Sequence, residues 1–234
     1  MRLLAVLALS TSLSAPAFAA TPEEVTAHYA DLALATYQDS LTTAQALQAA
    51  VAALIAAPSD ATLQAARSAW LASRVPYQQT EAFRFGNPIV DDWEGRVNAW
   101  PLDEGLIDYT AADYGNEDNT LASLNVIATP NFTLSGTEVD ATTITPGLIR
   151  DTLHEADGIE ANVASGYHAI EFLLWGQDLN GTGPGAGNRP FTDFAAGDAC
   201  SNGNCDRRAA YLQAATDLLV ADLKEMVANW SDTG

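Results

Sequence analysis

His168 and Glu171 are the two side chains in this sequence whose types and spacing could do chemistry together. Residues three apart lie on one face of an α-helix, so an imidazole and a carboxylate would stand one turn from each other. The next four residues, Phe172 to Trp175, are all apolar, which indicates that this helix is buried. An ionisable pair is costly to bury without compensation, and a bound metal ion would supply that compensation. The alternative is a pair that hydrogen-bonds to itself and binds nothing.

A useful metal site generally needs three or more ligands, so this pair requires a partner. The best candidate is Glu81, an acid in an aromatic and otherwise largely apolar segment. An ion pair with Arg74 or Arg84 is the competing interpretation of this acid. Asp103 and Glu104 form a possible additional site on a loop. Turn formation and helix capping are the favoured explanation for these last two acids.

Three other patterns resemble known motifs but lack an essential residue. His154 and Glu155 begin as a zinc-protease helix would, yet Gly158 stands where the second histidine is required. Asp178 begins a calcium-loop pattern whose twelfth position is Arg189, where a bidentate glutamate is needed. The glycine-rich stretch before Arg189 lacks the lysine and hydroxyl residue of a phosphate-binding loop. These patterns therefore predict neither a zincin, nor an EF-hand, nor a P-loop protein.

Cys200 and Cys205 are the two cysteines of the chain, and they flank a short polar loop. In an exported protein, a pair at this spacing predicts a disulfide that closes the loop. A pair of soft metal ligands is the alternative, which an oxidising compartment disfavours because it removes free thiols.

The first 19 residues are typical of a secretory signal peptide. Arg2 supplies a positive charge, an apolar run follows from Leu3 to Leu9, and Ala17-Phe18-Ala19 forms a small-residue cleavage site. The apolar run is too short to remain in a bilayer as a spanning helix. We therefore expect a signal peptide at residues 1–19 and an exported mature chain, in the periplasm or at the cell surface, without a transmembrane segment.

The charge of the chain restricts its partners. Thirty acidic residues face ten lysines and arginines, for a formal net charge of −20. Nucleic-acid binding through phosphate contacts needs clustered basic residues and is not expected. Cations are the natural small partners of such a surface, although acidity also serves solubility alone.

The pattern along the chain indicates helices, with little strand alternation. Thr21 and Pro22 begin the first helix, Pro58 ends it, and Ser59 or Asp60 can cap the second. We predict helices over residues 22–57, 60–85, 90–98, 119–127, 160–175 and 206–230, and a further helix from residue 145 that Gly158 interrupts. Pro76 should kink the second of these helices or leave one of its backbone hydrogen bonds open. Long alanine-rich helices joined by a short turn are typical of an antiparallel bundle, so we predict an all-α fold without a significant sheet.

The segment GYHAIEFLLWGQD, at residues 166–178, resembles the G-x-H-x-x-E signature of the imelysin-like family, also classed as M75 peptidases. Three further segments agree with that family: RVPYQQTEAFRFG, WEGRVNAWPLDEGLIDY, and the cysteine loop running into RRAAYLQAATDLLVADL. The family includes iron-regulated exported proteins and the periplasmic component of a ferrous-iron uptake system.

The resemblance implies an all-α fold of two up-down four-helix bundles, with a site near the signature and between the bundles. His168 and Glu171 match the signature directly, and Glu81 occupies the place of an acid in the matching helix. Family members usually continue beyond this length with a second bundle. We therefore expect residues 20–234 to form an N-terminal bundle plus part of a second, in a chain truncated at its C-terminus.

Three functions follow from these observations. The first is an exported iron-binding protein for acquisition, in which His168, Glu171 and Glu81 bind the metal; such a donor set also accepts zinc or copper. An iron-uptake partner at the inner membrane or cell surface would then receive the metal. The second is an M75-type zinc metallopeptidase, which the scarcity of histidines argues against, so we lean toward a protein that is not an enzyme. The third is a structural helical interaction domain.

Overall fold

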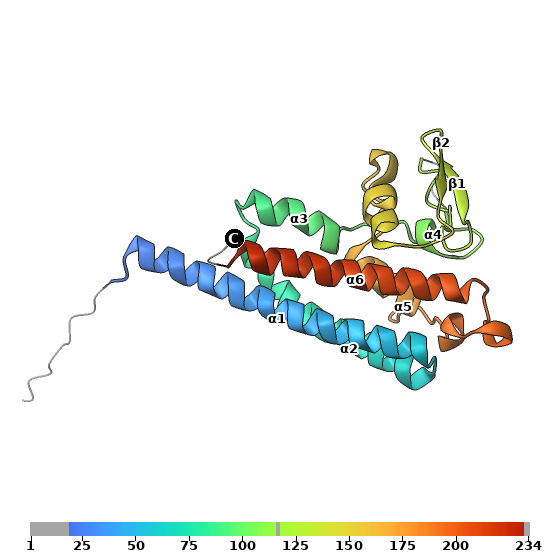
Figure 1. Cartoon of the computed structure of the whole chain (residues 1–234), viewed down its shortest axis with the longest axis horizontal. Helices are drawn as coiled ribbons and strands as arrows, with labels where there is room; N and C mark the ends of the chain where they lie inside the picture. The colour runs from blue at the N-terminus through green and yellow to red at the C-terminus, as the bar shows by residue number, and fades with distance from the viewer. Residues whose placement is uncertain (1–18, 116–117, 232–234) are drawn as a thin grey trace, which may run out of the picture.

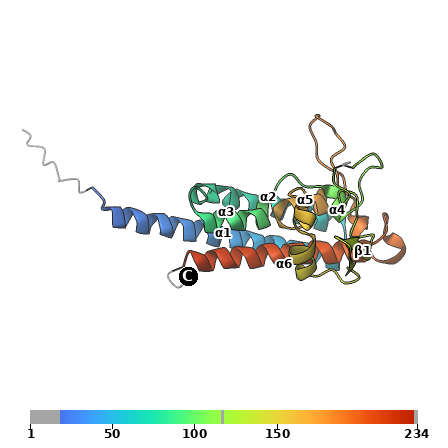
Figure 2. The same cartoon turned by 90° about the horizontal axis from the view of Figure 1, so that it is seen from above.

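Three long helices lie side by side and form the body of the molecule in the computed structural model, which describes residues 19–115 and 118–231 (Figure 1). α1 (Pro22–Ala56) and α2 (Asp60–Gln79) form an antiparallel hairpin, and α6 (Cys205–Asn229) packs against α1. At 1.5 Å per residue α1 is about 50 Å long. Its first turns project beyond the other helices in both ribbon views (Figures 1 and 2). The predicted mainly helical bundle is confirmed.

Side-chain caps explain where the first two helices begin. The hydroxyl of Thr21 accepts a hydrogen bond from the backbone N–H of Glu24, whose carboxylate accepts one from the backbone N–H of Thr21. Ser59 and Thr62 form the same reciprocal arrangement at the start of α2. Each box satisfies N–H groups that have no partner within the helix.

The second predicted helix continues past its proline and then changes character. Pro76 lies inside α2 and has no N–H to donate, so it removes one backbone hydrogen bond from the helix. The chain then tightens into the 3₁₀ turn η1 (Thr80–Phe83) and re-forms a helix at α3 (Pro88–Asn98). The predicted short helix at 90–98 is thereby confirmed.

The middle of the chain departs from prediction. The short α4 (Glu104–Ile107) is followed by turns over residues 119–127, where we predicted a helix. The N–H groups of residues 125–127 instead donate to the carbonyls of residues 105–107, at 2.8–3.1 Å. Pairing with α4 therefore replaces the local helix, and the prediction for this segment is wrong.

A small antiparallel hairpin is also present, although we predicted no significant sheet. β1 (Asn131–Leu134) pairs with β2 (Thr137–Asp140), and Phe132 lies opposite Val139. Ser135 and Gly136 connect the strands with φ values of +48° and +81°. Two positive φ angles are what a tight hairpin turn requires, and glycine supplies one of them without strain.

The segment before the motif helix is less helical than predicted. The expected helix from residue 145 is a single π-helical stretch, η2 (Leu148–Leu153), followed by the short η3 (Ala156–Gly158). Glu155 and Asp157 both adopt left-handed backbone conformations, so the helix is interrupted before Gly158 is reached. The expected helix over 160–175 is the shorter α5 (Gly166–Trp175).

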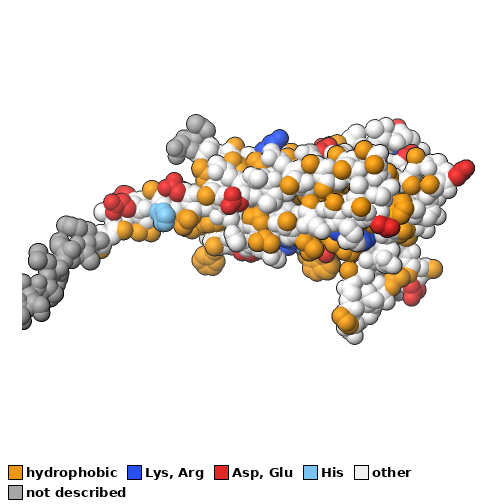
Figure 3. Space-filling model, turned by 90° about the horizontal axis from the view of Figure 1, so that it is seen from below, with side chains coloured by type: hydrophobic (Ala, Val, Ile, Leu, Met, Phe, Trp, Pro, Cys, Tyr) orange, Lys and Arg blue, Asp and Glu red, His pale blue; other side chains and the backbone are white. Residues whose placement is uncertain are grey.

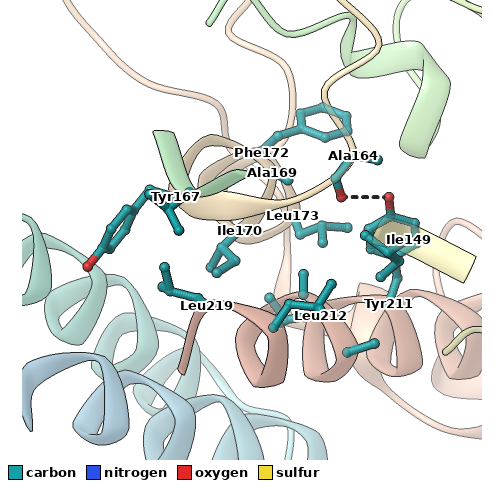
Figure 4. Packing of buried hydrophobic residues seen from close by; sticks show 14 of the residues in the cluster. Ile149, Ala164, Tyr167, Ala169, Ile170, Phe172, Leu173, Tyr211, Leu212 and Leu219 are labelled. Atoms are coloured by element: carbon teal, nitrogen blue, oxygen red, sulfur yellow. Dashed lines mark hydrogen bonds between the residues drawn. The ribbon is translucent and has the colours of Figure 1, made fainter. Parts of the chain in front are cut away.

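α5 is largely buried, and it packs against α6. Figure 4 shows Ile170 and Leu173 directed at Leu212 and Leu219 of α6, whereas Tyr167 points toward α2, where its ring centroid lies 4.7 Å from that of Tyr77. All of these side chains are buried in the hydrophobic core. The predicted buried character of this helix is confirmed.

The remaining elements are short. η4 (Phe191–Phe194) and η5 (Gly197–Ala199) precede the disulfide loop that leads into α6. Among the described residues, no helix combines the length and apolar character that crossing a bilayer requires. Residues 1–18 of the expected signal peptide lie outside the described residues.

Candidate functional site

The N-terminus of α5 is fixed by a close approach of two backbones. Gly166 has a φ of +82°, and a Cβ added there would lie 2.5 Å from the carbonyl oxygen of Val97, at the end of α3. The neighbouring Ser165 hydroxyl donates to the carbonyl of Arg96 at 2.9 Å. Only glycine provides both the backbone angle and the space, so the glycine of the motif places α5 directly against α3.

Hydrogen bonds from two further helices hold the same end of α5. The indole N–H of Trp70, on α2, donates to the carbonyl of Tyr167 at 2.9 Å. The hydroxyl of Tyr211, on α6, donates to the carbonyl of Ala164 at 2.9 Å, the dashed line in Figure 4. The start of the motif helix is therefore tied to three helices at once.

A buried arginine holds the other end of α5. The guanidinium of Arg67 donates from Nε and Nη2 to the carbonyl of Leu174, at 3.1 and 3.0 Å, and from Nη2 to the carbonyl of Arg189. A cation at the last carbonyls of a helix is also favoured by the helix dipole. With both ends fixed, the position of His168 and Glu171 is set by the rigid body of the fold.

His168 and Glu171 lie together on one face of α5, as predicted from their spacing. Nδ1 of His168 is 3.0 Å from Oε2 of Glu171, and the side chains are 19% and 42% exposed. The pair faces away from the core, which the apolar residues of the same helix fill. With Nδ1 engaged by the carboxylate, Nε2 is the ring nitrogen that remains for a ligand.

The pair lines a cleft of about 380 Å³. One wall is α5, a second comes from α2 and the segment before α4, and the third is the glycine-rich loop after α5. The lining is aromatic and acidic: Trp70, Leu71, Trp100, Leu102, Glu104, His168, Glu171, Phe172, Trp175, Asp178 and loop residues 185–187. The ring centroids of Trp100 and His168 are 5.0 Å apart.

Glu104 is the predicted additional acid that the structure brings to this cleft. Burial raises the pKa of its carboxyl to about 7; Arg189 opposes this rise, and the negative charges of Asp178 and Glu171 add to it. Glu104 therefore exchanges protons near neutral pH, in the same cleft as the histidine. An acid with such a pKa in a cleft is a candidate functional group.

Asp103, the other half of that predicted pair, does not line the cleft. It occupies the N-cap position of α4, and its carboxylate accepts a hydrogen bond from the side-chain amide of Asn119 at 2.6 Å. Its carbonyl accepts the N–H of Leu106 at 3.0 Å, which matches the turn half of the favoured explanation, whereas its side chain forms no capping hydrogen bond.

Glu81 lies elsewhere. Its side chain is 55% exposed, forms an ion pair with Arg84 at 3.7 Å and lines a separate cleft with Phe85 and Asp91. The structure therefore does not bring Glu81 to His168, and the interpretation of Glu81 as a partner of Arg84 matches its contacts. The predicted set of three ligands is not assembled by this arrangement.

The other two histidines are placed outside the cleft. Nδ1 of His154 lies 3.3 Å from the backbone N–H of Ala164, and Nε2 lies 3.1 Å from the carbonyl of Gly95. Burial lowers the pKa of His154, which keeps the ring neutral. His28 is on the exposed first turns of α1. In the described part of the chain, no three His, Cys, Asp or Glu side chains converge closely enough to hold a metal ion.

Cys200 and Cys205 are joined by a disulfide, as predicted. The closed loop is hydrogen-bonded to a buried acid, because the side-chain amide of Asn202 donates to the carboxylate of Asp193 at 2.6 Å. Asp193 also pairs with Arg189 at 2.9 Å, and Arg189 is the cation that acts on Glu104. The disulfide loop is thereby connected to one wall of the cleft.

Comparison with known proteins decides the family. Residues 33–234 match the sequence profile described as imelysin (Peptidase_M75). The chain belongs to the imelysin family. The match includes α5 and every residue that lines the cleft.

Two relatives of this imelysin-family chain carry iron-related names. Iron-regulated protein A of Synechococcus elongatus is 43% identical over 51 residues, which is 21% of this chain and 14% of that protein. A crystal structure described as an iron-regulated protein A precursor from Parabacteroides distasonis superposes with a TM-score of 0.55 at 24% identity. That alignment covers 88% of this chain and 44% of the other, so this chain spans less than half of its structural relative.

Sequence reasoning missed the aromatic part of the cleft. Trp70, Trp100 and Trp175 come from α2, the segment before α4 and the end of α5, and nothing in their spacing predicts that they meet. The sequence of the glycine-rich loop indicated only that it lacks the residues of a phosphate-binding loop, and did not indicate that it forms a wall of the cleft. Gly187 of that loop packs its Cα against the carbonyls of Trp175 and Gly176, a contact that leaves no room for a side chain.

Proposed function

We propose that this chain binds a transition-metal cation, with iron as its physiological ligand, through His168 in the cleft beside α5. The observation that carries the proposal is the pairing of His168 with Glu171 at 3.0 Å on the wall of an acidic cleft. A carboxylate on one ring nitrogen orients an imidazole and raises the basicity of the other nitrogen. That is the usual preparation of a metal-binding histidine.

The donor chemistry suits a borderline cation. An imidazole with carboxylates binds ferrous or ferric iron, and it also accepts zinc or copper. Glu104 and Asp178 line the same cleft and offer additional carboxylate oxygens. The net charge of −20 would raise the local concentration of cations. Figure 3 shows acidic side chains on the projecting start of α1 as well as on the body.

The proposed role is metal acquisition outside the cytoplasm. The iron-regulated names of the two relatives support iron, the signal-like residues 1–19 support export, and the disulfide fits an oxidising compartment. The expected partner is an uptake protein at the inner membrane or the cell surface. A zinc peptidase is the less favoured function, because among the described residues His168 is the one histidine lining the cleft, whereas the zinc sites of peptidases commonly use two or three.

Metal titration of the disulfide-intact chain tests the proposal, with the His168→Ala/Glu171→Ala double variant beside it. The chain offers a matched control, because His28 and Asp31 have the same spacing on the exposed part of α1. We expect near-stoichiometric iron in the wild type and in His28→Ala/Asp31→Ala, and a loss of at least tenfold in affinity in the cleft variant. Equal iron binding in all three proteins would refute the assignment of the site.

A further inference from the structure

The cleft offers a metal ion too few donors of its own. His168 and Glu171 are in contact, and within the described residues no third His, Cys, Asp or Glu side chain joins them at ligand distance. Non-haem iron sites with open positions still use three protein ligands. Most of the coordination shell of a metal held at His168 must therefore come from something other than this cleft's side chains.

The cleft is also larger than a bare ion requires. A water molecule takes up roughly 30 Å³ in the liquid, and the cleft holds about 380 Å³. Pockets of roughly 300–1,000 Å³ are typical of small organic ligands. The space beside His168 therefore fits an ion together with an organic molecule of one or two rings.

The wall nearest to His168 is suited to a flat ring. Trp100 is 69% exposed although its ring centroid is only 5.0 Å from that of the histidine. Leu71, which is 57% exposed, lies on the same cleft wall. Large apolar side chains left in water at the edge of a polar site indicate a surface that a ligand covers. A planar aromatic ring is the shape that stacks on an indole.

The charges in the cleft define the sign of the ligand. Three carboxyl groups line it, those of Glu104, Glu171 and Asp178. Burial raises the pKa of the Glu104 carboxyl, and the negative charges of the other two add to that rise. An anionic complex, such as ferric iron surrounded by three dianionic chelators, would be repelled. A one-to-one complex of ferric iron with a dianionic chelator carries a single positive charge and keeps open positions that His168 can fill.

We propose that the cleft takes its metal as a cationic one-to-one complex with a planar aromatic chelator of the catecholate class, whose ring stacks on Trp100 while His168 binds the metal. This inference rests on the proposed function and adds the chemical form of the cargo. The chelator supplies the donors that the cleft lacks, and the aromatic wall discriminates the loaded complex from a hydrated ion.

Equilibrium titration with one-to-one iron(III)–catechol tests the proposal, at pH 5, where the one-to-one cation is the main complex of this mixture. The visible catecholate-to-iron absorption reports whether the chelator stays on the metal, and quenching of tryptophan fluorescence reports binding. The test variant is Trp100→Leu. Phe85→Leu is the matched control, because Phe85 is 96% exposed and lines the separate cleft around Glu81.

We expect the wild type and Phe85→Leu to bind the complex with its absorption band retained, and Trp100→Leu to bind it about tenfold more weakly, the size of one aromatic contact. Equal affinity in Trp100→Leu, or loss of the band on binding, would overturn the inference. A parallel titration with iron(II) alone separates the two proposals. Iron(II) alone bound as tightly as the complex would overturn the chelate and leave the metal site standing; no iron uptake in either form would overturn both.

Discussion

Oε2 of Glu171 lies 3.0 Å from Nδ1 of His168, so the carboxylate faces the imidazole. This geometry is compatible with two distinct roles for Glu171 in metal binding. It can orient the ring and leave the metal to Nε2, or it can rotate and donate an oxygen to the metal itself. The two roles predict different behaviour for conservative substitutions.

Glu171→Gln separates these roles when compared with Glu171→Ala. We expect Gln to keep most of the iron affinity, because its amide oxygen still accepts the Nδ1–H hydrogen bond, while Ala loses 10- to 100-fold, as is typical of lost orienting partners. Isothermal titration of both variants measures the difference. Equal losses in Gln and Ala would assign Glu171 as a charged ligand.

Gly166→Ala should destabilise the fold. The residue has a φ of +82°, and a Cβ would meet the backbone of Val97. We expect the free energy of unfolding to fall by about 2–3 kcal/mol, from backbone strain and the steric contact together. Chemical denaturation measures this change. Gly95→Ala is the control, because a Cβ there meets nothing within 4 Å and alanine favours a helix; equal stability of both variants would show that the approach of α5 to α3 is not tight.

His154 should make the stability of the fold depend on pH. Burial lowers its pKa from the ordinary 6.5; Glu155 opposes this shift, and Arg150 and Arg96 favour it. The unfolded chain therefore binds a proton that the folded chain does not, and stability falls as the pH drops below about 6.5, by at most about 1.4 kcal/mol per pH unit.

Urea denaturation at pH 7.5 and 5.5 checks this dependence, with His154→Ala as the comparison. The variant loses the hydrogen bonds to Gly95 and Ala164 and should be less stable at pH 7.5. The difference between wild type and variant should shrink at pH 5.5. A constant difference at both pH values would mean that His154 does not titrate differently in the folded chain.

Glu104 should have the opposite pH dependence. Its pKa is raised from 4.5 to about 7, so the carboxyl favours folding while protonated and this contribution is lost as the pH rises through about 7. Glu104→Gln should therefore be more stable than the wild type at pH 8.5 and nearly equal to it at pH 5. Thermal denaturation at the two pH values measures this; a gap that does not change with pH would indicate an ionised Glu104 throughout.

The long helices could be predicted from the sequence because their signals are local. Caps at Thr21 and Ser59, alanine-rich interiors and the break at Pro58 determine α1 and α2 without tertiary information. The spacing of His168 and Glu171 likewise determines that they share a face. The disulfide followed from the spacing of two cysteines and the expected compartment.

The remaining features depend on contacts between distant segments. Residues 119–127 form turns because their N–H groups pair with α4, and no local pattern reports that pairing. Glu81 and Glu104 are both acids within four residues of an aromatic residue, yet of these two only Glu104 lines the cleft of His168. Which acid lines the cleft of the histidine is set by where η1 and α4 lie relative to α5, which the sequence pattern does not contain.

X-ray absorption at the iron edge tests the central claim most directly, with iron-loaded wild type compared with His168→Ala. The account predicts imidazole scattering in the iron shell of the wild type, and its absence in the variant prepared at the same iron concentration. An iron shell without imidazole in the wild type, or an identical shell in both proteins, would contradict the assignment of His168 as the metal ligand.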